Sequence, residues 1–151
     1  MNITEIRVKL VRGNRDKLRG FASVTVDDCL VIRDLKVIEG AARLFVAMPS
    51  RKLCDHCPGC GGKNHLRARF CNDCGGRLRE SRGGMDERGR PRLYADIAHP
   101  INQEARDFFQ GSVLEAYTNE LERSKQEGYV ETTFDDLDYH YLDESHEAEI
   151  P

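Results

Sequence analysis

Apolar and polar residues alternate along the first fifty positions with the two-residue period of β-strands. Ile6, Val8 and Leu10 share one face of a run that begins at Ile3, and basic residues stand between them. This alternation is typical of a strand with one buried face. Polar residues and a glycine over 12–16 predict the turn that follows it.

Three further strands are predicted in the same region. The second runs over 18–26, with Ala22, Val24 and Val26 on one face and Phe21, Ser23 and Thr25 on the other, and Asp27-Asp28 is short and polar enough to close a hairpin. The third covers 29–39 and includes Cys29 as a small buried apolar residue, and the fourth covers 43–47, before Pro49. Four neighbouring strands with short turns predict an antiparallel meander.

The pattern changes after residue 50 and returns to regular periods near residue 94. A fifth strand is predicted over 94–101, returning to the same sheet across the cysteine-rich segment. Asn102 is a suitable N-cap for an amphipathic helix to about Lys125, whose apolar stripe is Ala105, Phe108, Phe109, Ser112, Val113, Ala116 and Leu121. The predicted fold class is α+β: an antiparallel sheet, one C-terminal helix and an inserted module.

The length and the character of the N-terminus limit the possible classes of protein. A chain of 151 residues corresponds to one ordinary domain with a small appended module. The first seven residues do not form a basic start followed by an apolar run, and no stretch approaches the roughly 20 apolar residues of a membrane span. We therefore expect a soluble cytoplasmic protein without a membrane partner.

Charge is distributed unevenly along the chain. The first 92 residues carry a net charge of +9, whereas residues 127–151 contain nine Asp and Glu and no Lys or Arg. This asymmetry favours a polyanionic partner and an acidic appendage. The tail over 127–151 is predicted to be mostly disordered, with short segments around its aromatic residues that could dock.

Four cysteines form two C-x2-C-G motifs separated by ten residues. They are Cys57, Cys60, Cys71 and Cys74, and each pair is followed by a glycine. Clustered cysteines in a reducing cytosol indicate a metal site, and four thiolates fill the tetrahedral shell of Zn²⁺. The spacing predicts a zinc ribbon with a structural metal, because no position is left open for chemistry.

Other ligand sets remain open at the level of sequence. Cys54 forms a further C-x2-C with Cys57, and His56 and His65 lie nearby. The glycine that follows Cys60 matches the one after Cys74, which favours the set without Cys54. The two histidines are interpreted as exposed loop residues.

Two long motifs resemble the bacterial SpoVG family of septation and sporulation regulators. They are Leu44-Phe45-Val46-Ala47-Met48-Pro49-Ser50-Arg51-Lys52 and Tyr94-Ala95-Asp96-Ile97-Ala98-His99-Pro100-Ile101-Asn102. The resemblance implies a SpoVG-like α+β domain over 1–52 and 93–126. It does not cover the predicted zinc ribbon and basic linker over 53–92, which are inserted where typical members of the family have a short connection, or the acidic tail. It also implies a homodimer that binds DNA and RNA, through Arg51, Lys52 and Arg106.

Basic residues of the cysteine-rich segment favour the same partner. Lys63, Arg67, Arg69, Arg77 and Arg79 surround the predicted ribbon, and phosphate neutralisation by such side chains supplies most non-specific affinity. His99 and Asp96, three apart on a predicted strand, should lie on opposite faces, which favours a buried, hydrogen-bonded His99 over an acid–base pair.

The leading hypothesis is a regulatory protein that binds DNA or RNA, with the ribbon extending its basic surface. The alternative is a protein-interaction adaptor that uses the ribbon and the acidic tail. An enzyme is not expected, because the chain has no phosphate-binding glycine loop, nucleophile elbow or open metal position, and no small-molecule substrate is indicated. The target sequence and the process regulated are not encoded in any motif.

Overall fold

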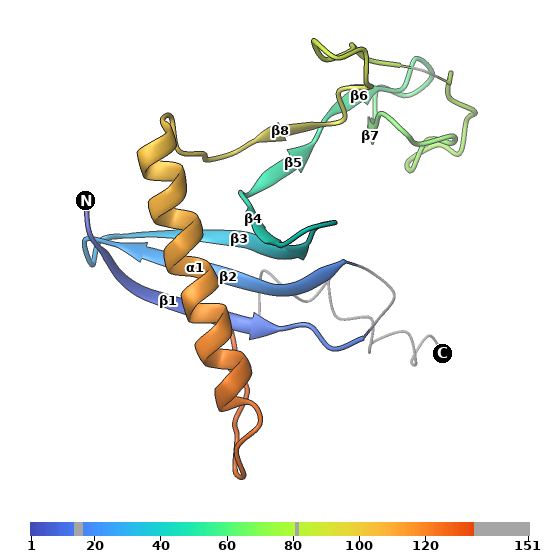
Figure 1. Cartoon of the computed structure of the whole chain (residues 1–151). Helices are drawn as coiled ribbons and strands as arrows, with labels where there is room; N and C mark the ends of the chain where they lie inside the picture. The colour runs from blue at the N-terminus through green and yellow to red at the C-terminus, as the bar shows by residue number, and fades with distance from the viewer. Residues whose placement is uncertain (14–16, 81, 135–151) are drawn as a thin grey trace. The chain divides into compact units, whose positions relative to one another are not determined.

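A computed structural model describes residues 1–13, 17–80 and 82–134 and divides the chain into two compact units. The first unit joins residues 1–47 to the chain from residue 100 onward, and the second comprises Met48–His99. The first unit holds a four-stranded antiparallel sheet in the order β1 (Ile3–Leu10), β2 (Leu18–Val26), β3 (Leu30–Glu39) and β4 (Leu44–Ala47). Helix α1 (Gln103–Arg123) crosses one face of this sheet (Figure 1). The predicted α+β meander with one helix is confirmed.

The turn between β2 and β3 corrects one prediction. Asp27 and Asp28 have positive φ values of 49° and 53°, a conformation that hairpin turns require and that aspartate tolerates better than most residues. Cys29 belongs to this turn, because β3 begins only at Leu30. The Cys29 side chain is therefore exposed, and the expectation of a buried cysteine is wrong.

Strand β2 is the centre of the first unit and is buried on both faces. Ala22 and Val24 are fully buried, and Phe21 and Ser23 on the opposite face are only 9% and 5% exposed. Phe21 packs against Phe134, with Val11 and Leu18 beside them. The chain that follows the helix thus supplies part of the second layer. Residues 135–151, where the rest of the predicted disordered tail falls, lie outside the described residues.

Helix α1 begins at the predicted cap, but its buried face differs in part from the predicted apolar stripe, which did not include Tyr117. The Asn102 side chain accepts a hydrogen bond of 2.8 Å from the Ala105 N–H, which satisfies one free donor of the first turn. Phe109, Val113 and Tyr117 are buried against the sheet. Phe108 and Leu121, which were predicted to belong to the apolar stripe, are 44% and 37% exposed.

The second unit contains two short ladders. Strand β5 (Ser50–Lys52) pairs with β8 (Tyr94–Asp96), and β6 (Cys54–His56) pairs with β7 (Lys63–His65). The prediction of one strand over 94–101 that returns to the main sheet is wrong. The chain after Pro49 provides the partner instead: Ser50 lies opposite Asp96, and the Ile97 N–H donates to the Pro49 carbonyl.

Candidate metal centre and basic surface

The structure brings together the four cysteines of the two C-x2-C-G motifs. Their Sγ atoms all lie within 4.8 Å of one another, with 3.8 Å between Cys57 and Cys74 and 3.5 Å between Cys60 and Cys71. A tetrahedral zinc with bonds of about 2.3 Å separates its sulfur ligands by about 3.8 Å. The donor set and its dimensions therefore fit one tetrahedral metal ion.

Each cysteine pair sits on a tight turn with the same hydrogen bonds. In the first turn, the N–H of Gly61 donates to the Cys57 carbonyl, and Gly75 and Cys71 repeat this bond in the second. Gly61 and Gly75 have φ values of +78° and +74°, a region that favours glycine. This explains the glycine after each motif: it lets the chain reverse.

Backbone N–H groups point at all four sulfurs. Gly59 donates to Cys57 at 3.3 Å, and the N–H groups of Gly62, Asp73 and Gly76 donate to Cys60, Cys71 and Cys74 at 3.4 Å each. Such donors stabilise negative charge on sulfur, which a metal-bound thiolate carries. Each of the four sulfurs therefore has a backbone donor that would stabilise its thiolate.

Two of the four thiols, those of Cys60 and Cys71, have pKa values that are shifted in opposite directions. Hydrogen bonds from the Cys74 N–H, the Asn64 side-chain amide and the Asp73 N–H lower the pKa of Cys71 to about 6. The Gly62 N–H lowers the pKa of Cys60, but the neighbouring thiols of Cys71 and Cys74 outweigh it and raise the value to about 12. The hydrogen bonds around Cys71 thus favour its thiolate, which is the form in which a cysteine binds a metal.

The alternative ligands lie outside the cluster. The Cys54 thiol is exposed and donates to the Lys52 carbonyl at 3.5 Å. His56 Nδ1 lies 2.9 Å from the Gly61 carbonyl oxygen, and His65 is exposed opposite Cys54 in the β6–β7 ladder. His56 and His65 are exposed, as the sequence interpretation expected.

Arg82 connects several segments of the second unit (Met48–His99), called the metal module below, although no pattern in the sequence singles it out. Its guanidinium donates to the carbonyls of His65 and Ala68 at 2.9 and 3.2 Å, and its Nε lies 3.0 Å from an Asp55 carboxylate oxygen. Only 12% of the Arg82 side chain is exposed. Arg82 therefore has a structural role, whereas the arginines around it are exposed. The sequence alone does not indicate this role, because the partners of Arg82 are 14 to 27 residues away.

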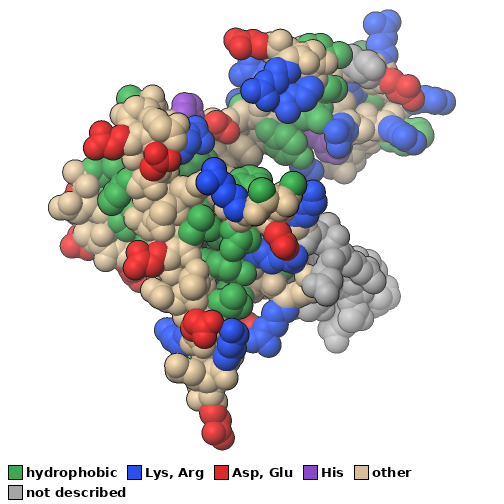
Figure 2. Space-filling model, viewed as in Figure 1, with side chains coloured by type: hydrophobic (Ala, Val, Ile, Leu, Met, Phe, Trp, Pro, Cys, Tyr) green, Lys and Arg blue, Asp and Glu red, His purple; other side chains and the backbone are tan. Residues whose placement is uncertain are grey.

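The predicted nucleic-acid contacts fall mostly in the second unit and are all exposed. Lys and Arg side chains gather on this unit in Figure 2. Arg51 and Lys52 are on β5, Lys63 is on β7, Arg67, Arg69 and Arg77 flank the second cysteine pair, and Arg106 is on α1 in the first unit. Within 1–13, 17–80 and 82–134, none of these seven forms an ion pair, whereas Arg82 and Arg90 do.

His99 and Asp96 lie closer together than the sequence predicted. Strand β8 ends at Asp96, so the alternation of a strand does not extend to His99. His99 Nδ1 is 3.6 Å from the Asp96 carboxylate, and the two side chains are 50% and 56% exposed. The prediction of a buried His99 on the opposite face is wrong.

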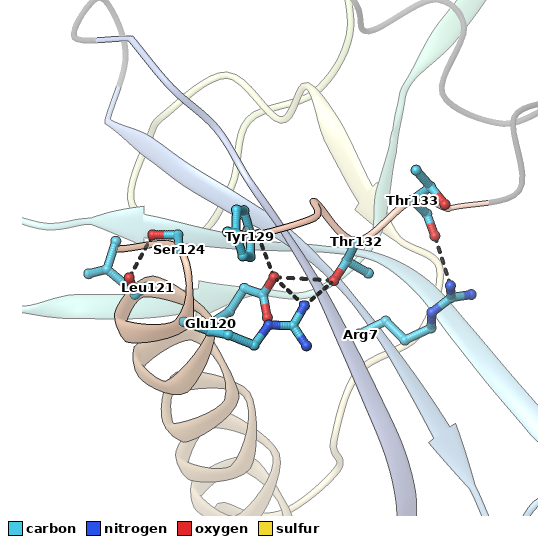
Figure 3. A network of polar contacts seen from close by, with 8 residues as sticks. Arg7, Glu120, Leu121, Ser124, Tyr129, Thr132 and Thr133 are labelled. Atoms are coloured by element: carbon cyan, nitrogen blue, oxygen red, sulfur yellow. Dashed lines mark hydrogen bonds and ion pairs between the residues drawn. The ribbon is translucent and has the colours of Figure 1, made fainter. Parts of the chain in front are cut away.

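A polar network around Glu120 in the first unit was not anticipated (Figure 3). The Glu120 side chain, 10% exposed, accepts hydrogen bonds from Tyr129 at 2.5 Å, Thr132 at 3.2 Å and Arg123 at 3.1 Å. Arg7 of β1 donates to the Thr133 carbonyl at 2.9 Å. These bonds hold residues 129–133 against the sheet and helix. The signal in the sequence was the spacing of Glu120, seven residues after Val113 and three after Tyr117, which puts all three on the same face of α1.

Within the described residues, no helix combines the length and apolar character that a membrane crossing requires.

Comparison with known proteins places this architecture in a family. The sequence profile of SpoVG matches residues 1–119, which include the cysteine module. Relatives named as candidate SpoVG septation proteins include one from Bdellovibrio bacteriovorus, 37% identical over 121 residues that cover 80% of this chain and 77% of the relative. Another from Lachnospira eligens is 38% identical and covers 78% and 91%, and one from Clostridium beijerinckii is 34% identical and covers 85% and 100%. With the motifs at both ends of the cysteine module and the meander-plus-helix fold, these matches show that the chain belongs to the SpoVG family.

Proposed function

We propose that this SpoVG-family protein is a regulator that binds DNA or RNA and that its metal module carries much of the binding surface. The observation that supports this most is a set of exposed cations on β5, β7 and the second cysteine turn that form no ion pair with any carboxylate in the described part of the chain. Unpaired, exposed lysines and arginines contact phosphates without first breaking an ion pair.

The charge of the second unit supports the proposal even after the metal is counted. Residues 48–99 contain eleven Lys and Arg against six Asp and Glu, a net charge of +5. A zinc ion with four thiolates adds a net −2, which leaves about +3. The basic residues therefore exceed what is needed to balance the centre, and they are placed on its outside.

Zinc is the metal we propose for the cysteine cluster, in a structural role. Four thiolates favour Zn²⁺ over harder cations, and a closed shell leaves no position for a substrate. Among the described residues of the second unit, the buried apolar cluster consists of Leu78, Cys57 and Cys71, with Ala68 packed against them. The folding of the metal module must therefore depend largely on the metal.

In the same proposal the protein acts as a cytoplasmic homodimer and converts no small molecule. Sedimentation velocity at micromolar concentration tests the dimer directly, since a monomer of 17.2 kDa and its dimer separate clearly.

The test of nucleic-acid binding is a salt titration with the zinc-loaded full chain and a short DNA duplex. Each phosphate contact contributes about 0.9 to the slope of log affinity against log salt. We expect the substitution of both Arg51→Ala and Lys52→Ala to reduce that slope by about 1.8 and to weaken binding equally for unrelated sequences.

A matched control removes the same charge elsewhere. Lys17→Ala with Arg43→Ala, two exposed residues of the first unit, should leave the slope nearly unchanged. A flat salt dependence of the parent protein, or unchanged binding in the Arg51/Lys52 variant, would contradict the proposal and favour the protein-interaction adaptor.

A further inference from the structure

Phe70 is an exposed aromatic residue in the most basic part of the metal module. Its side chain is 60% exposed, and its neighbours Arg69, Arg77 and Arg79 are exposed as well. Among the described residues, no other ring and no cation packs on the Phe70 ring. The metal module thus leaves an aromatic surface open to solvent.

The backbone fixes Phe70 beside a cation. Phe70 and Arg77 form an isolated antiparallel bridge, flanked by hydrogen bonds from Leu78 N to Arg69 O and from Cys71 N to Gly76 O, both 2.8 Å. A pair bracketed in this way has its Cα atoms about 4.5 Å apart and its side chains on the same face. The side chains of Arg77 and Phe70 therefore leave the backbone on the same face of the bridge.

The metal ligands hold this pair from both sides. Cys71 follows Phe70 directly, and Cys74 precedes Arg77 by three residues. The two strands of the bridge are thus the two arms of the second cysteine turn. Metal binding would fix the position of the ring as well as the fold of the turn.

A second pair of the same kind lies on the β5–β8 ladder. Lys52 is directly opposite Tyr94, and Tyr94 is 54% exposed. Exposed aromatic rings paired with cations suit single-stranded nucleic acid, because an unpaired base stacks on the ring while its phosphate meets the charge. In a duplex the faces of the bases are covered by neighbouring bases, so the ring cannot stack on them.

We propose that Phe70, with Arg77 beside it, is a base-stacking site for single-stranded nucleic acid, and that Tyr94 with Lys52 is a second such site. This inference rests on the proposed nucleic-acid-binding function and specifies its ligand. The site recognises the face of a base and a phosphate, and so tolerates different sequences.

The first experiment compares two substitutions of Phe70 in the zinc-loaded full chain, with a twelve-nucleotide oligo(dT) as the probe. Phe70→Leu keeps an apolar side chain without a ring and should weaken binding by at least about fivefold, since stacking contributes about 1–3 kcal/mol per base. Phe70→Tyr keeps the ring and should bind like the parent protein. Neither changes charge, so both should keep the parent salt slope, and neither should change duplex affinity.

An oligonucleotide of the same length with abasic sites separates rings from phosphates. We expect the parent protein to bind it more weakly than oligo(dT), and we expect Phe70→Leu to cause no further loss. Arg77→Ala should weaken both probes and reduce the salt slope by about 0.7, the value for one contact to a single strand.

A fluorescence measurement reports the stacking itself. The chain contains no tryptophan, so Phe70→Trp introduces a single indole at the site. Its emission should be quenched by saturating oligo(dT) and not by the abasic oligomer. Zinc content measured on each variant confirms that the cysteine turn is intact.

The outcomes distinguish this inference from the function on which it rests. If the parent protein binds oligo(dT) with a steep salt dependence, but Phe70→Leu binds equally well and the indole is not quenched, the stacking site is refuted and the phosphate surface stands. If the parent protein binds neither oligo(dT) nor duplex at low salt, both proposals are wrong.

Discussion

Cys71 is a buried member of the cysteine cluster and accepts hydrogen bonds from two different segments. Its sulfur accepts hydrogen bonds from the Asp73 N–H and the Asn64 side chain, and its backbone N–H closes the turn with Gly76. We expect Cys71→Ser to abolish stoichiometric zinc binding and to unfold residues 54–78, because the module has too small an apolar core to fold alone. Metal analysis and amide NMR spectra would measure both effects, and the resonances of the β1–β4 sheet should not change.

Cys54→Ser is the matched control for this variant. Cys54 is exposed, its thiol donates to the Lys52 carbonyl, and it is not one of the four clustered cysteines, so one zinc per chain should remain. Full zinc content in the Cys71 variant, or loss of zinc in the Cys54 variant, would show that the ligand set is different.

Tyr129 tests the network around Glu120. Tyr129→Phe removes the hydrogen bond to the carboxylate and should lower the free energy of unfolding by about 1 kcal/mol in urea denaturation. Val130→Ala, at a position 79% exposed, should have no effect.

The pH dependence of the same pair follows from the pKa of Tyr129. Loss of hydration and the bond to Glu120 raise this pKa above its usual value of 10.0. Because the pKa of Tyr129 is higher in the folded state than in the unfolded state, the neutral hydroxyl stabilises the fold below pH 10. This stabilisation is lost as the pH rises through the folded-state pKa. The difference between parent and Tyr129→Phe should stay constant from pH 6 to 9; a difference that shrinks within this range would contradict the assignment.

Among the elements, the helix start offers the cleanest test of the fold. Asn102→Ala removes the acceptor for the Ala105 N–H and should lower the stability of the first unit by about 1 kcal/mol. Asn102→Asp keeps an acceptor and adds a negative charge that the helix N-terminus favours, so it should match the parent protein. Equal losses in both variants, measured by urea denaturation, would show that the cap bond is not the cause.

Elements whose determinants are local could be predicted from the sequence. The alternation in β1 to β4, the cap at Asn102 and the spacing of the cysteines all depend on neighbours within a few residues. The burial of both faces of β2 could not be predicted, because it depends on Phe134 meeting Phe21 across more than a hundred residues. The pairing of the three-residue strands β5 and β8 could not be predicted either, because the two strands are separated by about forty residues of the chain.

The candidate site divides in the same way. The four candidate metal ligands could be predicted from the sequence because the two cysteines of each C-x2-C-G motif lie within one turn. The roles of Arg82 and Glu120 could not be predicted in this way, because their contacts are with residues farther along the chain. The prediction for His99 is wrong because the predicted strand runs to residue 101, whereas β8 ends at Asp96.

For the whole molecule, the distribution of charge leads to a prediction about the acidic tail. Residues 135–151 contain seven Asp and Glu and no Lys or Arg, and as a tethered segment they act at an effective concentration on the order of millimolar. Deleting them should tighten nucleic-acid binding several-fold at low salt, where screening is weakest, without changing zinc content. Unchanged affinity and salt slope would show that the tail does not compete with nucleic acid.

A longer deletion separates this effect from folding. Removing 127–151 also removes Phe134 and the bonds to Glu120. The loss of one buried phenylalanine alone costs about 2 kcal/mol. We therefore expect the longer deletion, and not the shorter one, to lower the free energy of unfolding in urea.

The most direct test of the central claim is an amide chemical-shift map of the zinc-loaded full chain titrated with a short oligonucleotide. The account predicts that the largest changes fall on β5, β7 and the second cysteine turn, at Arg51, Lys52, Lys63 and residues 67–79. Changes confined to the β1–β4 sheet, or none at saturating oligonucleotide, would contradict it.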